Sequence, residues 1–329
     1  MEILEAYCEE LDQVLNIYDA QKAYFALPAA ARKRFTFRCS DHDCRAAANP
    51  LVSGINYDKL AEDSDKFRQI HFRAPAGHPH QDDCYWVCED AARRKPVASD
   101  GDAAKPRLER AKKTNVIDVF TPKLSDDRAV KAGPSTGQPP ADGKPREARE
   151  QKEKYRAREG YSTTTRLERF IDCWSQLEGD ELKQNEVVIA GRALSYRQAV
   201  THAEWLTPAD NGTRIVQGGV KATFWPKDAP KRLYLNFMSG CDKFPDNEGG
   251  KTLTIDLPLS RIDAYNGGAM LLEKIRQGQA KGHYVKVYCW GDIKARDRRE
   301  GYLLDVASLD NLVIKAIAVK PKTSSAENE

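Results

Sequence analysis

The spacing of apolar residues divides the chain into three stretches, and the first begins with a helical period. Between residues 2 and 34 apolar side chains recur every three or four positions, which predicts helix, and Pro28 can divide it into two segments. The pattern then alternates in "RFTFRC" at 34–39 and "KFRQIHFRA" at 66–74. These two segments predict short strands, and "CYWVC" at 84–88 is a candidate third strand.

The second stretch, residues 93–162, has no regular apolar pattern. Pro, Gly, Ala and mixed charges dominate it, so it cannot bury enough apolar surface to offset the entropy cost of ordering. We therefore predict a disordered linker. The apolar island "NVIDVF" at 115–120 interrupts it. Val116 to Phe120 either adds a strand to a protein partner or to a flanking domain of this chain, or is a chance apolar patch.

Regular patterns return at Thr163 and continue to residue 320. A helix is predicted near the start of this third stretch, because five apolar residues share one helical face: Leu167, Phe170, Ile171, Trp174 and Leu177. From Thr213 onward the period is two, which predicts β-strands, with one helix between the third and fourth strands in "AYNGGAMLLEKIRQGQ" at 264–279. The tail, residues 321–329, is expected to be unstructured.

Composition places the chain among cytoplasmic proteins with two domains. Of 329 residues, 52 are Lys or Arg and 49 are Asp or Glu, so the net charge of +3 neither predicts nor excludes a nucleic-acid partner. The mean hydropathy of −0.66 agrees with a partly unfolded chain. No apolar run is long enough to span a bilayer, and the acidic start is not a signal peptide. In the cytoplasm, clustered cysteines are more often metal ligands or free thiols than disulfides.

Four of the six histidines and four of the eight cysteines lie between residues 39 and 88. A structural zinc site needs four nitrogen or sulfur ligands in a tetrahedron, and two cysteines a few residues apart can point both sulfurs inward. Two such pairs are present, which predicts one Zn²⁺ bound by Cys39, Cys44, His80 and Cys84. A sphere without a carboxylate is closed and structural. The possible substitute ligands are His71, His78 and Cys88.

The same segment resembles a known family. "FTFRCSDHDC" followed by "IHFRAPAGHPHQDDC" is similar to the N-terminal zinc-binding region of competence CoiA-like proteins, over roughly 50 residues. The resemblance implies zinc and a role in DNA metabolism, such as a bacterial mobile element, DNA-processing or defence system. The spacing of four residues between Cys39 and Cys44, and the long stretch before the last ligand, depart from that pattern.

The C-terminal strands resemble an OB-fold single-strand-binding domain. Their outer faces alternate aromatic and basic residues, which can stack on bases and contact phosphates. The predicted nucleic-acid-binding residues are Trp225, Tyr234, Tyr284, Lys286, Tyr288, Trp290, Lys294, Arg296, Arg298 and Arg299. The alternatives are that the aromatic residues pack beneath the helix at 163–177, or that this surface binds a protein.

The predicted fold class is α+β. It comprises a helical zinc-knuckle domain (1–92), the disordered linker (93–162), an OB-like small β barrel with flanking helices (163–320) and the tail (321–329). No nucleotide-binding loop, zinc-protease motif or serine-nucleophile motif occurs in the sequence, so we expect no enzyme activity. Asp256 and the pair Glu273–Lys274 are weak nuclease candidates, and Cys241 is a weak nucleophile candidate.

The sequence thus predicts a zinc-containing accessory protein that binds single-stranded DNA, or RNA, through its C-terminal barrel. The first alternative is an adaptor that recruits protein partners through the zinc domain and the island at Val116 to Phe120. The second alternative is a nuclease of the CoiA-associated kind.

Overall fold

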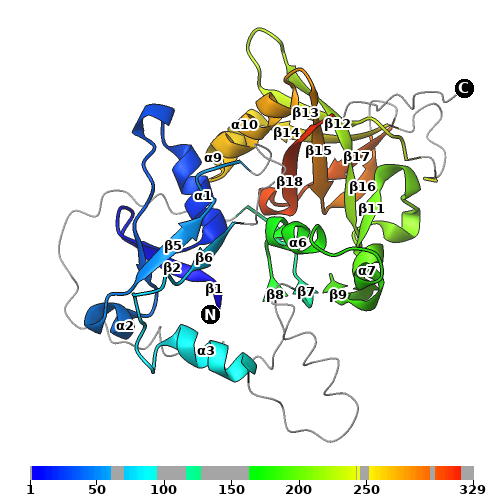
Figure 1. The fold of residues 1–329 in the computed structure, drawn as a ribbon. Helices are drawn as coiled ribbons and strands as arrows, with labels where there is room; N and C mark the ends of the chain where they lie inside the picture. The colour runs from blue at the N-terminus through cyan, green and yellow to red at the C-terminus, as the bar shows by residue number, and fades with distance from the viewer. Residues whose placement is uncertain are drawn as a thin grey trace, which may run out of the picture.

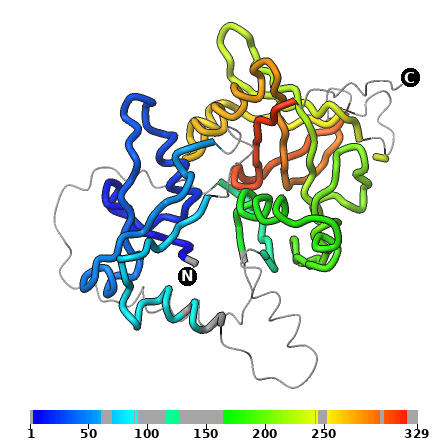
Figure 2. The backbone as a smooth tube through the Cα atoms, in the orientation of Figure 1, coloured from blue at the N-terminus to red at the C-terminus, as the bar shows by residue number. Residues whose placement is uncertain are grey.

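In the computed structural model the chain forms an N-terminal unit and a larger C-terminal unit (Figure 1). The structure describes residues 2–60, 70–94, 116–126, 163–241, 243–244, 252–296 and 301–319. The backbone tube shows the N-terminal unit in blue and cyan beside the C-terminal unit in green to red (Figure 2). The tail at 321–329 lies outside the described residues.

The N-terminal unit is built on a six-stranded antiparallel sheet with the strand order β1-β6-β5-β4-β2-β3. Aromatic rings fill its core, with Phe37 packed edge to face against Tyr57 and Phe72 at centroid distances of 5.3 and 5.0 Å. This arrangement adds to the stability gained by burying the rings. The strands are β1 (Glu2–Ile3), β2 (Glu5–Cys8), β3 (Gln13–Asn16), β4 (Phe37–Cys39), β5 (Leu51–Ile55) and β6 (His71–Arg73).

The prediction of a helix over 2–34 is wrong for its first half. Residues 2–16 form β1–β3, and helix α1 spans only Ile17–Ala26. Ala6 and Cys8 of β2 are buried while their neighbours are half-exposed, so the period is two. The turn at residues 9–12, with Glu9, Glu10 and Asp12, reverses the chain between β2 and β3. Asn16 then caps α1, because its side-chain oxygen accepts a hydrogen bond from the Asp19 N–H.

The predicted strand at 84–88 is also wrong, because this segment begins helix α3 (Tyr85–Arg94). Asp41 Oδ2 accepts a hydrogen bond from the Tyr85 N–H at 2.8 Å and so caps the helix from a distant segment. Asp41 also caps the short helix α2 (His42–Ala47) through Oδ1. One carboxylate therefore starts two helices, and no local pattern in the sequence indicates that.

The C-terminal unit contains an eight-stranded sheet with the order β16-β17-β14-β13-β12-β15-β18, and β11 pairs in parallel with β12. The sheet is open and not the predicted small barrel, because β16 and β18 lie at opposite edges and do not pair within the described residues. A second parallel pairing, β14 with β17, widens the sheet further. The strands are β11 (Val200–His202), β12 (Ile215–Trp225), β13 (Arg232–Phe237), β14 (Leu253–Pro258), β15 (His283–Cys289), β16 (Asp292–Ala295), β17 (Tyr302–Asp305) and β18 (Leu312–Ala318).

Helices cover the two faces of this sheet unequally. One face is wholly apolar and packs against α9 (Leu259–Ala264) and α10 (Gly268–Gly278), which confirms the helix predicted between the third and fourth strands. On the other face, α6 (Leu167–Trp174) covers one part and leaves a second part exposed. Among the described residues, no helix is long and apolar enough to cross a membrane. The remaining helices are η1 (Ala29–Ala31), α7 (Glu181–Gln184), α8 (Tyr196–Ala199), η3 (Ala203–Trp205), η4 (Pro208–Asp210) and η5 (Leu309–Asn311).

The apolar island of the predicted linker adds a strand to this chain's own C-terminal unit. Strand β7 (Val119–Phe120) pairs in parallel with β8 (Thr163–Thr164) and β9 (Glu186–Ile189), and β10 (Arg192–Ser195) completes a small four-stranded sheet. Ile117 and Phe120 are fully buried. Residues 116–126 are therefore part of the fold and not of a disordered linker. The rest of the segment from 95 to 162 lies outside the described residues.

The two units meet where α1 lies beside α10 (Figure 1). At this contact Asp310 of η5 binds three groups from distant segments, and we call these four residues the Asp310 cluster. Its carboxylate accepts from Lys22 Nζ at 3.0 Å, from Lys123 Nζ at 2.9 Å and from the Tyr265 hydroxyl at 2.6 Å. The Lys22 side chain is only 6% exposed, so its charge is balanced inside the protein.

Candidate metal centre

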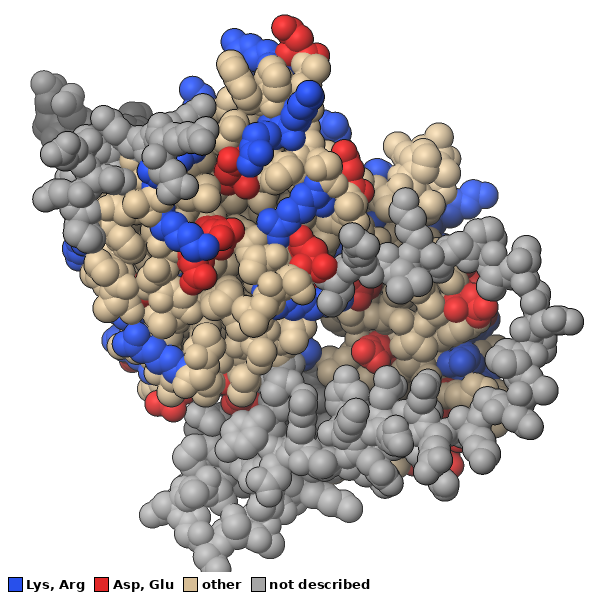
Figure 3. Space-filling view, turned by 180° about the vertical axis from the view of Figure 1, so that it is seen from behind, with Lys and Arg blue, Asp and Glu red and all other residues tan. Residues whose placement is uncertain are grey.

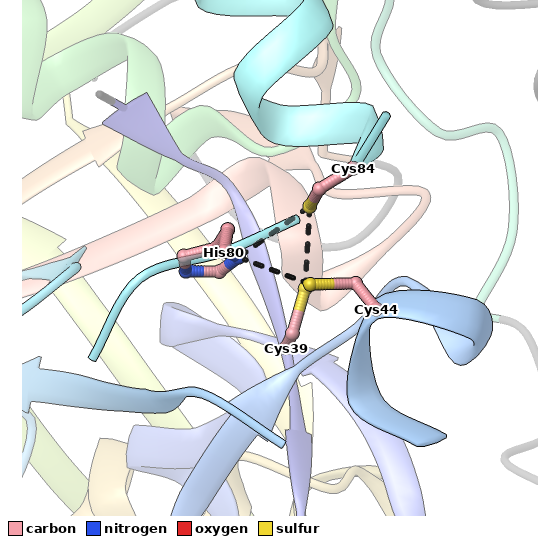
Figure 4. A group of neighbouring side chains, drawn as sticks. All are labelled: Cys39, Cys44, His80 and Cys84. Carbon is pink, nitrogen blue, oxygen red and sulfur yellow. Dashed lines mark hydrogen bonds between the residues drawn. The ribbon is translucent and has the colours of Figure 1, made fainter. Parts of the chain in front are cut away.

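The four predicted ligands converge on one point in the N-terminal unit (Figure 4): Cys39, Cys44, His80 and Cys84. Cys39 ends β4, and Cys44 lies on α2 just after the turn. His80 lies in the loop after β6, and Cys84 immediately precedes α3. The short strand β4 and the two helices capped by Asp41 thus set the directions of the three sulfurs.

The distances among the four ligand atoms suit a tetrahedral ion. Cys39 Sγ lies 3.6 Å from Cys84 Sγ, and His80 Nδ1 lies 3.7 Å from Cys44 Sγ and 3.4 Å from Cys84 Sγ. All four atoms lie within 4.8 Å of one another. Zinc–sulfur bonds of about 2.3 Å at tetrahedral angles separate two sulfurs by about 3.7 Å. The residues present therefore fit a zinc ion without a large rearrangement.

Outer hydrogen bonds hold this geometry. Arg45 donates to the Cys39 carbonyl at 2.7 Å, and the Gln81 N–H donates to Cys44 Sγ at 3.4 Å. Trp86 Nε1 donates to Ser40 Oγ at 2.8 Å and ties α3 to the turn that carries the first two ligands. Such supporting contacts orient the ligands around a metal.

Burial makes the three thiols dependent on a cation. Cys39, Cys44 and Cys84 are each at most 1% exposed. The hydrogen bond from the Cys39 thiol lowers the pKa of Cys84 to about 4, whereas the same bond raises the pKa of Cys39 and burial raises the pKa of Cys44. The protein alone therefore stabilises one thiolate of the three. A divalent cation bound here would supply the charge that lets the other two lose their protons.

The alternative ligands lie elsewhere. His71 on β6, His78 and Cys88 are all exposed, and Cys88 Sγ instead approaches the Asp82 carbonyl at 3.7 Å. The structure brings together the four predicted ligands and none of these three.

The predicted nucleic-acid-binding residues separate into three groups. Trp225 is 56% exposed, and Tyr234, Tyr284 and Lys286 are half-buried on the uncovered part of the large sheet. Lys294 and Arg296 lie on or beside the edge strand β16, where Lys294 pairs with Asp305 at 2.7 Å. Arg298 and Arg299 lie outside the described residues.

Tyr288 and Trp290 form the third group, and they are core residues. They are 5% and 8% exposed and pack in the apolar cluster under α6, where the Tyr288 ring lies 6.0 Å from that of Trp174. Trp290 Nε1 donates to the Gly212 carbonyl at 3.1 Å. They have no free face for a base, so the alternative that the aromatic residues pack beneath the predicted helix holds for these two.

The uncovered face also contains three residues that the prediction missed. Lys221 is exposed, Met238 is 63% exposed and Lys315 is partly exposed. Lys221 lies four positions before Trp225 in "VKATFW" and therefore on the same face of the strand, so the period of two could have identified it. Lys315 joins the face only because β18 pairs with β15, and the sequence does not reveal that pairing.

The chain matches no protein-family model, and no significant match was found among curated proteins or solved structures. The resemblances to CoiA-like zinc regions and to OB-fold domains therefore stay predictions. The function has to be inferred from the chemistry of these residues.

Proposed function

We propose that the N-terminal unit binds one zinc ion and that this ion is structural. The observation that supports this is the convergence of three buried thiols and one imidazole at the edge lengths of a zinc tetrahedron. Four protein ligands leave no position for water or substrate, so the ion would hold β4, α2 and α3 together and would not activate a nucleophile.

Metal analysis tests this proposal directly. Protein purified without chelators should contain about one equivalent of zinc, as a four-ligand site implies. Cys44→Ser should lose the metal, because it removes one of the four ligands. Cys88→Ser is the matched control, because Cys88 is exposed on α3 and outside the site, and it should retain the full equivalent. A wild type that folds without metal contradicts the proposal.

We further propose that the uncovered face of the large sheet binds single-stranded nucleic acid, DNA or RNA, so that the protein acts as a zinc-containing accessory factor. What supports this is the combination on one face of Trp225, Tyr234 and Tyr284 with Lys221 and Lys286. Exposed rings can stack on bases of any sequence, and lysines can contact the phosphates between them. An open sheet face replaces the barrel groove of the sequence prediction.

The surface charge sets the expected strength of this binding. The view from behind shows Lys and Arg interspersed with Asp and Glu, and the described surface in that view has no large area of one sign (Figure 3). A protein with a net charge of +3 and mixed surface charge should make few phosphate contacts. We therefore expect moderate affinity, with stacking as the main contribution.

Aromatic substitutions test this second proposal. Trp225→Ala and Tyr284→Ala should each weaken binding of a labelled single-stranded oligonucleotide by roughly 1–3 kcal/mol, as expected for lost stacking. Trp205→Ala is the matched control, because Trp205 is 62% exposed on η3 and not on these strands. Duplex of the same sequence should bind more weakly. Equal affinity for duplex and single strand, unchanged by either substitution, rejects the proposal.

The adaptor alternative recruits protein partners through the zinc domain and the island at Val116 to Phe120, and the oligonucleotide titration separates it from nucleic-acid binding. The buried Ile117 and Phe120 make the island a part of the fold, so the exposed Trp225 and Met238 are better anchors for a partner. The nuclease alternative has less support among the described residues. Asp256 pairs with Arg232 at 2.8 Å, and Lys274 pairs with Glu168 at 3.4 Å.

A further inference from the structure

Three lysines lie on three neighbouring strands of the uncovered face. Lys286 of β15 is directly opposite Lys315 of β18, and on its other side it is opposite Gly219 of β12. Lys221 follows two positions after Gly219, so it lies diagonally from Lys286 on the same face. Because Gly219 has no side chain, neighbouring side chains can extend over the backbone beside Lys286.

The facing lysines are not neutralised equally. Lys315 Nζ lies 3.6 Å from Asp172 Oδ1, whereas no carboxylate of the described residues lies within ion-pair distance of Lys286. Like charges directly opposite each other on adjacent strands destabilise a sheet. Burial and then the charge of Lys315 lower the pKa of Lys286. Both ammonium groups lie over the Tyr288 ring, at 5.0 and 5.9 Å from its centroid, which holds them close together.

An apolar shelf adjoins the lysines. A Cβ atom on Gly219 would lie 3.6 Å from Tyr284 Cδ2 and 2.3 Å from Met238 Cε, so both side chains extend over the glycine. Met238 is 63% exposed and Tyr284 is half-buried. A tyrosine ring and a thioether lying side by side offer a flat, polarisable surface of the kind on which a base stacks.

We propose that these residues form a nucleotide subsite, in which a base stacks on Tyr284 and Met238 and a phosphate group lies between Lys286 and Lys315. A phosphate there offsets the repulsion between the two ammonium groups. This inference rests on the proposed binding of single-stranded nucleic acid and names the position at which one nucleotide of the strand is bound.

Two probes test the subsite separately from the proposed function. The first is a labelled oligothymidylate, titrated at several salt concentrations. Lys286→Gln should lower its affinity about threefold to tenfold and reduce the salt slope by about 0.7, as expected for one lost phosphate contact on a single strand. Tyr284→Ala should lower the affinity with an unchanged salt slope. Lys183→Gln is the control, because Lys183 is exposed on α7 and paired with Asp180, and it should match the wild type.

The second probe is inorganic pyrophosphate, titrated calorimetrically into the full-length protein. It should bind the wild type and Lys183→Gln but not Lys286→Gln. Oligonucleotide binding that is indifferent to Lys286→Gln overturns the subsite and leaves the proposed function standing. Pyrophosphate binding that requires Lys286, in a protein that binds no oligonucleotide, overturns the proposed function and retains a phosphate subsite. Binding of neither probe overturns both.

Discussion

The Cys/His cluster lies beside α2 and α3 of the N-terminal unit, whereas the Asp310 cluster lies where α1 meets the C-terminal unit, and the two join polar groups in opposite ways. The four metal ligands come from one stretch, residues 39–84, whereas Asp310 gathers Lys22, Lys123 and Tyr265 from three segments far apart in sequence. In the function proposed above, the first arrangement takes an ion from solution. The second is complete within the chain, because the carboxylate balances part of the lysine charge and Lys22 also donates a hydrogen bond to the Tyr265 hydroxyl.

This difference predicts how each region responds to metal removal and to substitution. A structural zinc ion contributes about 10–16 kcal/mol of apparent binding free energy at neutral pH, and that contribution disappears with the metal. A buried ion pair contributes little net stability, but loss of one partner costs about 3–5 kcal/mol because it leaves a buried charge unbalanced. Metal removal should therefore act on one unit only, and a substitution in the Asp310 cluster should act on the contact between units.

The largest effect is expected from removing the metal. Chelation, or Cys44→Ser, should unfold β4, α2 and α3, because the short elements around the site lose the ion that joins them. Hydrogen exchange should then be fast across residues 37–55 and 70–94, while the core strands β12–β15 stay protected. Equal loss of protection in both units contradicts the comparison, since it would mean that the two units unfold together.

The next effect is expected from Asp310→Asn. This substitution leaves Lys22 and Lys123 without their carboxylate, so the free energy of unfolding should fall by about 3–5 kcal/mol. Denaturant unfolding measures the change. Asp305→Asn is the matched control, because its ion pair with Lys294 lies at the surface, and no measurable change is expected there. A fall of similar size in both variants would show that the cluster has no special role.

The sequence predicted the metal centre because its chemistry is local. A pair of cysteines five residues apart, and a histidine four residues before a cysteine, are spacings that one turn can close, so the four residues that converge in the structure were chosen from eight candidates. Nothing comparable indicated the Asp310 cluster. Its members share no spacing, and Asp310 itself reads as an ordinary turn residue.

The errors in the predicted fold also arise because contacts between residues far apart in the sequence decide the structure. Residues 2–16 contain apolar residues at helical spacing, but sheet pairing with β4 and β6 decides their structure. The spacing of two places Tyr288 and Trp290 on the same strand face as Lys286, which suggests that they are exposed. However, α6 covers that end of the sheet and leaves Tyr284 uncovered. Period two assigns residues to a face of a strand, but only tertiary packing decides which part of that face contacts water.

A smaller effect is expected on the stability of the protein at acidic pH. Burial alone would raise the pKa of Asp310, but the charge of Lys22 and the hydrogen bonds from Tyr265 and Lys123 outweigh it and hold that pKa well below its usual range. An acid whose folded pKa is lowered contributes stability above its unfolded pKa of about 3.9 and loses it as pH falls further. Denaturant unfolding between about pH 5 and pH 2 should therefore show a steeper loss in wild type than in Asp310→Asn. Parallel curves would contradict the role of Asp310.

The smallest effect is expected from comparing Lys22, which is paired with a carboxylate, with Lys286, which is not. Lys22 has a carboxylate partner, whereas Lys286 faces Lys315, so Lys286→Gln should raise the free energy of unfolding by about 0.2–1 kcal/mol at neutral pH, as expected for relief of a like-charge cross-strand pair. The pKa of Lys286 is lowered in the folded state. As pH rises toward about 10, this lysine is therefore protonated more often in the unfolded chain than in the folded chain. The wild type should consequently gain stability relative to Lys286→Gln over that pH range. Lys221→Gln is the control, since Lys221 lies opposite Asn236 and not opposite a lysine. Destabilisation by Lys286→Gln would mean that this lysine supports the sheet and is not held there for an anionic ligand.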